Sequence, residues 1–576
     1  MTAGVVETGE AFTVATANPE TMSQKIVAAI RKHGVWIVAL LAVVASISGL
    51  RNGFALDDVH IIVENDRVHS LAHAWRLFGQ TYWPPVEGAS LYRPLTMLFF
   101  ATEWVIGKGS PLPFHVVNIV LYAGVCAALY RLLREITDRD IALIATALFA
   151  VHPVHTEAVA NVVGQAELLV AIALFLAVER YIKARRSGNP GWRDVSIISA
   201  LFLGGCLAKE HMIILPGLLA VSEVLINRGT ETLLERIKRM APTFVALGVV
   251  AVAFVAVRAV VTGGFRGGSN ELFGYEAYYA RVLTMLTIVI EWLRLFFWPA
   301  QLSSDYSFPR TRIATVPDVD MLPGVLVVIG SAVIAWRLRR SNPVVTFGFL
   351  WVAVTLAIPS NLLIVTGFVL AERTLFLASA GVMLMVAVGV VQLWKSGEGR
   401  RVVHQALIAA VGVLLVCGIW RSSTRSPVWR DNETLFHQTV EDVPFSSRAH
   451  WMLAEYLLDE GRPREGVDDM MIAIVLARKD NGVIVAFGAD LLQSADMCGR
   501  AIPLYKRAMA LKPKDEQLRT NASLCLIKLG RVGEARKNAQ AGLLKGTVTP
   551  KLDWVISFAD SLERARRPLK VAAAAP

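Results

Sequence analysis

Two adjacent carboxylates, Asp57 and Asp58, stand seven residues beyond a strongly apolar stretch that ends near residue 50. A chain that leaves a bilayer there keeps its next few residues at the depth of the lipid headgroups. A carboxylate at that depth can take the proton from an acceptor hydroxyl while a membrane-anchored donor presents its leaving group. The pattern predicts a general base at Asp57 or Asp58, although an isolated Asp pair is also typical of a helix cap or a solvated turn.

A second polar segment, HPVHTEAVANVVGQAELL, is predicted to lie at the same membrane face. Imidazole and carboxylate groups bind phosphate oxygens, sugar hydroxyls or metal ions. The spacing of its first three such residues resembles a metal site, but HExxH is absent and no third-ligand motif can be fixed. We therefore predict polar substrate contacts rather than a metal, with a metal site and purely structural hydrogen bonding as alternatives. The candidates are His152, His155, Glu157 and Glu167.

Charged pairs interrupt two later apolar runs, Lys209-Glu210 in AKEH and Glu372-Arg373 in AERTLF. Buried charges in a membrane need partners, so each pair could simply neutralise itself. However, these polar interruptions are all predicted to lie at the same membrane face. This favours a binding site in which the cations hold a lipid phosphate. We predict this role for Lys209, Arg373 and Arg93, the last in the YRP motif, and substrate contacts for Glu210 and Glu372.

The elements that position these residues are apolar helices. Hydrophobic residues make up 54% of the 576 positions and gather in runs of spanning length, which predicts an all-α, polytopic membrane protein with about 11 transmembrane helices. The net charge of +11 does not indicate nucleic-acid binding, because Lys and Arg fall mainly in short loops between the runs. The runs lie near residues 34–50, 113–133, 140–152, 167–182, 194–207, 211–226, 241–261, 321–336, 344–358, 374–394 and 403–420.

Alternate loops carry the basic residues, which the positive-inside rule places in the cytoplasm together with a tail over residues 1–33. The loops with Asp57 and His152 then face outward, as does everything after residue 421. This arrangement requires that residues 276–298 do not cross, and the charges of that segment favour an interfacial or re-entrant helix. If the segment does cross, the C-terminal region moves to the cytoplasm unless another segment fails to span.

After residue 420 the composition changes to that of a soluble helical domain. Two segments align with Gly461 over Gly530, an offset of 69 residues and close to twice the roughly 34-residue tetratricopeptide period. A middle unit fits between them, with Ala495 at the turn. We predict a membrane catalytic domain over 34–420, an extracytoplasmic tetratricopeptide-repeat domain over 421–567 and a tail over 568–576. Such stacks form concave surfaces for extended peptides or serve as structural caps.

The five cysteines lie in no CxxC or Cys/His ligand spacing, which argues against a zinc site and against covalent attachment of a c-type haem. Cys498 and Cys525 fall in the repeat region. They could pair in an oxidising compartment or remain as two core thiols.

The sequence resembles the transmembrane and tetratricopeptide-repeat O-mannosyltransferases, relatives of the protein O-mannosyltransferases with the GT-C glycosyltransferase fold. The resemblance covers residues 34 to about 545, and HPVHTEAVA followed by AERTLFL is its most specific part. It rests on FALDDVHIIVEND, YRPLTMLFF, FHVVNIVLY, LFAVHPVHTEAVANVVGQAELL, LAKEHMIILP, IPSNLLIVTGFVLAERTLFLASAG and the C-terminal repeats.

The resemblance implies transfer of a sugar, typically mannose, from a polyprenyl phosphate to Ser or Thr hydroxyls of an exported polypeptide, with inversion at the anomeric carbon. It implies that Asp57 or Asp58 is the base, that Lys209 and Arg373 hold the donor phosphate, and that no metal or other cofactor is required. The chain departs from the family pattern at Gln165, where the family has Arg, and its repeat array is short, with about three units. A narrower or different acceptor range is expected.

Two other classes remain as alternatives. A non-catalytic membrane scaffold would recruit partners through its repeats but would leave the clustered charges unexplained. A transporter would place charges at mid-bilayer on broken helices and show an inverted repeat, which the sequence lacks. The Ala-, Val- and Arg-rich composition of the chain favours a bacterial plasma membrane over the endoplasmic reticulum. In either membrane the active site is predicted to face away from the cytoplasm.

Overall fold

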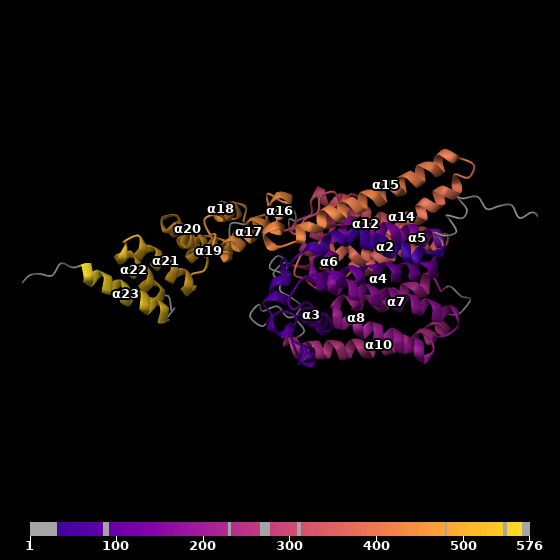
Figure 1. Ribbon diagram of the computed structural model, residues 1–576, viewed down its shortest axis with the longest axis horizontal. Helices are drawn as coiled ribbons and strands as arrows, with labels where there is room; N and C mark the ends of the chain where they lie inside the picture. The colour runs from indigo at the N-terminus through magenta and orange to yellow at the C-terminus, as the bar shows by residue number, and fades with distance from the viewer. Residues whose placement is uncertain are drawn as a thin grey trace, which may run out of the picture.

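The computed structural model describes residues 32–84, 91–227, 232–264, 277–307, 313–477, 481–544 and 550–566. Over these residues the chain is helical and has no strand, which confirms the all-α prediction. A bundle of apolar helices forms one body, and a stack of shorter helices leads away from one end of it (Figure 1). The predicted tails lie outside the described residues, apart from residues 32 and 33.

Each of the predicted apolar runs forms a helix in the bundle. These helices are α2 (Gly34–Ser46), α4 (Leu112–Ile136), α5 (Arg139–Ala150), α7 (Gln165–Arg186), α8 (Trp192–Ala208), α9 (Leu215–Leu225), α10 (Leu233–Thr262), α12 (Leu322–Leu338), α13 (Pro343–Leu356), α14 (Phe376–Ser396) and α15 (Arg401–Arg425). Three further helices are α3 (Pro94–Gly107), α6 (Thr156–Ala160) and α11 (Tyr278–Phe297). Short 3-10 or π turns are η1 (Ile47–Arg51), η2 (Val59–Val63), η3 (Asp66–Val68), η4 (Ala74–Gly79), η6 (Pro153–His155), η7 (Val162–Gly164), η8 (Glu210–Ile214), η9 (Val319–Met321) and η10 (Glu372–Leu375).

Within the described residues, seven helical segments are long and apolar enough to cross a membrane, or eight if α5 and its bent continuation Pro153–Ala160 form one span. The chain is therefore a multi-pass membrane protein. The predicted number of about 11 exceeds this count because α8, α9 and α13 are shorter than a full span. Polar or proline-containing segments end these helices early, and irregular backbone of this kind is tolerated at membrane depth where it is buried or lines a cavity.

Residues 278–297 form one continuous helix, α11, rather than a re-entrant turn. Arg294 on this helix pairs with Glu291, and Arg281 donates a hydrogen bond to the Asn361 carbonyl at 3.1 Å. These three charges keep α11 out of the group of apolar spans. Glu276, which the sequence analysis assigned to the same segment, lies outside the described residues.

The centre of the bundle is formed by α7 and α14, each with 78% of its spanning stretch buried. By contrast, only 11%, 17% and 6% of the corresponding stretches of α10, α12 and α15 are buried. The helices α10 and α15 lie at opposite margins of the bundle (Figure 1). Their exposed Val, Leu and Ile side chains suit contact with lipid tails.

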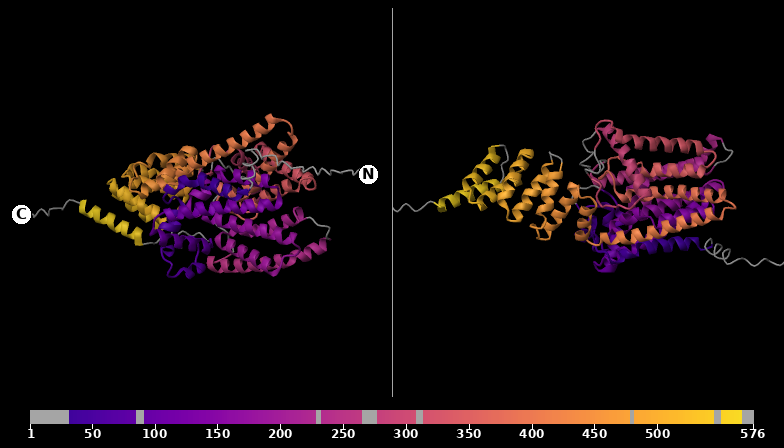
Figure 2. Two further views of the ribbon diagram at one scale, coloured as in Figure 1. Left: turned by 45° about the vertical axis from the view of Figure 1, so that its right-hand side comes forward. Right: turned by 90° about the horizontal axis from the view of Figure 1, so that it is seen from above.

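Beyond residue 420, α15 continues to Arg425 and passes through η11 (Ser426–Trp429), so the domain boundary predicted at residue 420 falls within this helix. The solenoid helices are α16 (Asn432–Asp442), α17 (Ser447–Asp459), α18 (Val467–Leu476), α19 (Gly482–Ser494), α20 (Cys498–Leu511), α21 (Glu516–Lys528), α22 (Val532–Leu544) and α23 (Pro550–Arg566). The pairs α17/α18, α19/α20 and α21/α22 stack in order along the solenoid (Figure 2).

The turn inside each helix pair contains one residue with positive φ: Gly461 (73°), Asp496 (64°) and Gly530 (75°). The spacings of 35 and 34 residues confirm the predicted period. The equivalent residue in the middle unit is Asp496, and the alignment of Ala495 with the glycines was wrong by one position. Asp tolerates the left-handed conformation better than most side chains, because it is short and polar.

Cys498 and Cys525 form a disulfide that joins α20 to α21 within the solenoid core. The sequence had left this pairing open.

Candidate functional site

The structure separates the two adjacent aspartates. Asp58 is buried, with 1% of its surface exposed, and both of its oxygens are engaged. Its Oδ1 accepts a hydrogen bond from the Val163 N–H at 2.9 Å, and its Oδ2 accepts from the N–H groups of Val162 at 3.2 Å and Ala55 at 3.3 Å. Burial raises the pKa of Asp58 to about 7, against the opposing effect of these three bonds. Asp58 therefore ties the first outer loop to the second.

Asp57 is the more accessible of the two aspartates. Its side chain is 26% exposed, and its Oδ2 lies 3.8 Å from a guanidinium nitrogen of Arg373. An accessible carboxylate beside a cation can accept a proton from an incoming hydroxyl, whereas the engaged carboxylate of Asp58 has no open face. The residue before Asp57, Leu56, has a φ of 56°, in the left-handed region.

Arg373 is one of three cations in this region, and each is paired with a carboxylate from another element. The guanidinium of Arg93 lies 3.0 Å from Glu210, that of Arg373 lies 3.0 Å from Glu157, and Lys209 pairs with Glu167. One interpretation of the sequence was that the adjacent charges in AKEH and AERTLF neutralise each other. The structure shows instead that each cation pairs with a glutamate from another element. Glu157 holds Arg373 twice, because its second oxygen accepts from the Arg373 backbone N–H at 2.8 Å.

The exposure of the ion pairs is uneven. Glu157 and Glu167 have side chains that are 4% and 3% exposed, whereas Arg373 and Lys209 are 18% and 15% exposed. The charge of Lys209 interacts with those of Arg93 and Arg373, which places all three cations in one site. In the third pair the order is reversed, with Glu210 25% exposed and Arg93 15% exposed. The three cations thus form a partly exposed positive group, an arrangement suited to an anionic ligand.

Tyr82 belongs to the same site, although the sequence analysis did not single it out. Its side chain is buried, and its hydroxyl has no hydrogen-bond partner among the described residues. The Arg93 guanidinium lies 5.0 Å from the centre of its ring, and the charges of Asp57 and Arg373 also act on it. Burial raises the pKa of this phenol, so it remains a proton donor. Its only sequence signal was its place among the aromatic residues of the first outer loop.

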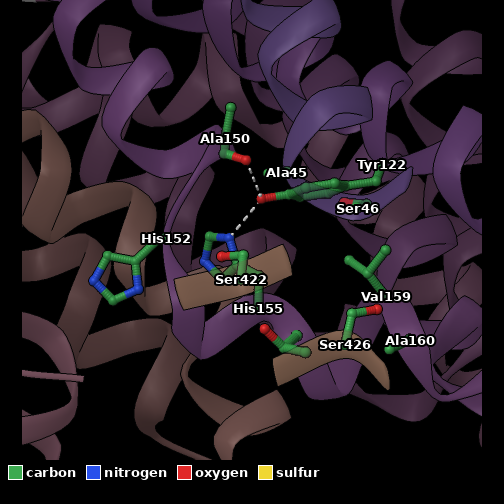
Figure 3. Close-up of a pocket in the computed structure, with 11 residues that line it drawn as sticks. Ala45, Ser46, Tyr122, Ala150, His152, His155, Val159, Ala160, Ser422 and Ser426 are labelled. Carbon is green, nitrogen blue, oxygen red and sulfur yellow. Dashed lines mark hydrogen bonds between the residues drawn. The ribbon is translucent and has the colours of Figure 1, made fainter. Parts of the chain in front are cut away.

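The two predicted histidines lie elsewhere, in the interior of the bundle. His155 lies between the Tyr122 hydroxyl and the Ser379 hydroxyl, at 2.8 Å from each, and His152 lies 2.9 Å from the Phe296 carbonyl. Both line a cavity of about 20 Å³, bordered also by Ser422 of α15 (Figure 3). A volume of this size has room for about one water molecule. These contacts match the structural alternative named for the segment.

Glu372 is also engaged internally. Its Oε1 accepts from the Ser303 N–H at 2.7 Å and from the Tyr306 hydroxyl at 2.6 Å, and the residue is 2% exposed. Glu372 therefore anchors the 303–306 segment beside Arg373. The structure brings Asp57, the three cations and their three glutamates together, and it places Glu372 and the histidines in supporting positions.

The side chain of Gln165 is fully buried and donates to Glu103 at 2.7 Å and to Asn118 at 3.2 Å. An Arg side chain at this position would extend from the same buried part of the backbone. Gly164 before it is required, because a Cβ there would collide with the Ala158 carbonyl. This tight turn brings the N–H groups of Val162 and Val163 to Asp58.

No group of three or more His, Cys, Asp or Glu residues in the described ranges is arranged to hold a metal ion. The expectation of a metal-independent reaction stays a prediction.

A multi-pass helical membrane protein with a charged site beside a helical solenoid is the class that these observations define. In sequence, the chain is similar to protein O-mannosyl-transferases. It is 27% identical to one from Caenorhabditis elegans over 76% of this chain, 27% identical to TMTC4 of Homo sapiens over 74%, and 25% identical to TMTC3 of Mus musculus over 93%. The alignments cover 62%, 64% and 62% of those relatives, so the chain spans somewhat less than two thirds of their length. No protein-family model matches the chain.

Among solved structures, the oligosaccharyltransferase of Archaeoglobus fulgidus superposes over 69% of this chain and 55% of its own, at 12% identity and a TM-score of 0.42. A score of this size does not establish a common fold.

Proposed function

We propose that this protein is a membrane glycosyltransferase that moves a sugar, with mannose as the first candidate, from a polyprenyl phosphate to Ser or Thr hydroxyls of exported proteins. The observation that carries the proposal is the partly exposed carboxylate of Asp57 beside Arg373, which belongs to a group of three cations, each held by a glutamate. The similarity to protein O-mannosyl-transferases supports the reaction class and the sugar.

The mechanism follows from this geometry. Asp57 takes the proton of the acceptor hydroxyl while the hydroxyl oxygen attacks the anomeric carbon of the sugar. The bond from that carbon to the phosphate oxygen breaks on the opposite side, so the configuration inverts and the polyprenyl phosphate leaves with one more negative charge. Arg373, Arg93 and Lys209 stabilise this developing charge, and the Tyr82 hydroxyl donates a hydrogen bond to a phosphate oxygen.

The glutamates hold the cationic side chains of Arg373, Arg93 and Lys209 in position. Glu157, Glu167 and Glu210 balance the three cations, which limits the cost of keeping them in a membrane protein. Asp57 adds a fourth carboxylate, whose Oδ2 lies 3.8 Å from a guanidinium nitrogen of Arg373. Glu372 fixes the turn from which Arg373 extends.

The buried contacts of Gln165 also bear on the departure from the family pattern. Because this side chain bonds to Glu103 and Asn118 and to none of the three cations, the loss of an Arg there leaves those cations in place. A polyprenyl-monophosphate donor therefore remains compatible with this chain.

We place the site and the solenoid on the side of the membrane away from the cytoplasm, with a bacterial plasma membrane as the first candidate. The solenoid leads away from the bundle at the end where α6 lies (Figure 1). The Cys498–Cys525 disulfide in the solenoid supports an oxidising compartment, since disulfides are rare in the cytosol. The solenoid would then meet polypeptides after their export.

The test is transfer of radiolabelled mannose from polyprenyl-phosphate mannose to protein, in membranes with wild type, Asp57→Asn or Glu64→Gln. Glu64 is a matched control, an exposed carboxylate of the same loop that pairs with His60. We expect label with wild type and Glu64→Gln and none with Asp57→Asn. Equal label with all three would remove Asp57 from the mechanism, and no label with wild type for mannose or any other sugar donor would refute the reaction class.

A further inference from the structure

The loop that carries Asp57 is held by the first turns of the chain after the last membrane helix. The Gly53 N–H donates to the Arg430 carbonyl at 2.7 Å, and the Asn52 side chain donates to the Ser426 carbonyl at 2.9 Å. Nearest to the aspartate, the Leu56 N–H donates to the Asn432 side-chain oxygen at 2.6 Å. These contacts join residues more than 370 positions apart in the sequence.

The bond to Asn432 falls at a residue with an unfavourable backbone conformation. Leu56 has a φ of 56°, a conformation that a Leu side chain rarely adopts without support. This angle determines the direction in which the chain enters Asp57. A hydrogen bond to the Leu56 N–H therefore fixes the orientation of the Asp57 carboxylate as well as the loop.

Apolar packing reinforces the same contact. Ala55 is fully buried in a cluster with Trp429 of η11, Leu435 of α16 and Leu453 of α17. Leu56 packs against this cluster. The first solenoid helices therefore form part of the wall behind Asp57, rather than a separate body on a linker.

A second contact reaches the other side of the site. Ser446, the N-cap of α17, donates to Asp305 at 2.6 Å, and Ser304 lies within hydrogen-bonding distance of Thr439 of α16. The segment around these residues is the one anchored by Glu372, next to Arg373. The helices α16 and α17 thus contact both the loop of the carboxylate and the segment beside its cation.

We propose that Asn432 is a positioning residue for Asp57, and that α16 and α17 couple the solenoid to the catalytic loop. The role assigned to Asp57 rests on the proposed function. Asn432 does not touch the substrates. It acts by holding Leu56 in its left-handed conformation, and a change in the placement of α16 changes the orientation of the base.

The test uses the full-length protein in lipid nanodiscs. Asn432→Ala removes the acceptor for the Leu56 N–H, and Asn481→Ala is a matched control, because its side-chain oxygen accepts from the Ile484 N–H at 3.2 Å at the start of α19. A third variant combines Asn432→Ala with Leu56→Gly, since glycine adopts positive φ without strain. If Asn432→Ala is not recovered in membranes, Asn432→Gln, which moves the acceptor by one methylene, takes its place with the same expectation.

We expect Asn432→Ala to lower kcat for mannose transfer by about tenfold, with the KM for the donor unchanged, because a misplaced group loses orientation rather than binding. Asn481→Ala should behave as wild type, and Leu56→Gly should restore most of the loss. Amide hydrogen exchange across residues 54–58 should be faster in Asn432→Ala than in wild type or Asn481→Ala.

Two results would overturn the proposal: equal kcat and equal exchange in Asn432→Ala and Asn481→Ala, or a loss of activity that Leu56→Gly does not relieve. Failure of the proposed function is distinguishable, because wild type would then transfer no sugar. The exchange measurement, which needs no substrate, would still decide whether Asn432 holds the loop.

Discussion

Replacing the two adjacent aspartates one at a time should produce two different kinds of defect. Asp57→Asn removes the proposed base but disturbs only a partly exposed pair with Arg373 at 3.8 Å, so the free energy of unfolding should change by less than about 1 kcal/mol. The loss of a general base typically lowers kcat by about 10²- to 10⁴-fold. The variant should therefore be well folded and nearly inactive.

Asp58→Asn should instead weaken the fold. An Asn side chain has one acceptor oxygen, so it cannot serve both the Val163 N–H on one side and the Val162 and Ala55 N–H groups on the other. Its least damaging orientation leaves the Val163 N–H facing an amide group, at a cost of about 1–3 kcal/mol for an unsatisfied buried donor. Activity should fall in proportion to the loss of folded protein and of loop order.

The assay is thermal unfolding of both purified variants, followed by transfer kinetics on the folded fraction. Asp57→Asn should melt with the wild type and show the larger loss of kcat per folded molecule, whereas Asp58→Asn should melt several degrees lower. The reverse pattern, an unstable Asp57→Asn and a stable but inactive Asp58→Asn, would refute the assignment of roles.

Three further outcomes are expected. Because burial raises the pKa of Asp58 to about 7 from 3.8, its contribution to stability is complete below about pH 4 and is lost as the pH rises through 7; the melting temperature should fall between about pH 4 and 7 and level off above, and this fall should be absent in Asp58→Ala. Tyr82→Phe should raise the donor KM or lower kcat by about tenfold with little effect on melting, since its hydroxyl has no partner among the described residues, and a kinetically normal variant would remove it from the site. Reduction of the Cys498–Cys525 bond should lower the melting temperature of the solenoid, measured by protease resistance of the C-terminal fragment, and an unchanged profile would contradict its stabilising role.

The helices and the charged residues were predictable from the sequence, because apolar runs and polar interruptions are local patterns. Every predicted run is a helix, and the site contains Asp57, Arg93, Lys209 and Arg373. Within the described residues, fewer helices than predicted runs have the length and composition of a full span, because α8, α9 and α13 are short.

The pairing of these charges was not predictable, because it depends on how the helices pack. Lys209 forms an ion pair with Glu167 rather than with the adjacent Glu210, and Arg373 pairs with Glu157, 216 positions away. No local pattern distinguishes Asp58, bonded to the second outer loop, from Asp57. The positive φ of Leu56 was equally hidden, because a Leu side chain gives no signal for this conformation.

The most direct test of the account is single-turnover transfer by the purified protein, from synthetic polyprenyl-phosphate mannose of defined anomeric configuration to a Ser/Thr acceptor peptide, with the product configuration read by NMR. We predict a mannosylated peptide of inverted configuration with the wild type and with Glu64→Gln, and none with Asp57→Asn. A product of retained configuration, or equal product from Asp57→Asn and wild type, would contradict the claim that Asp57 activates the acceptor for direct displacement.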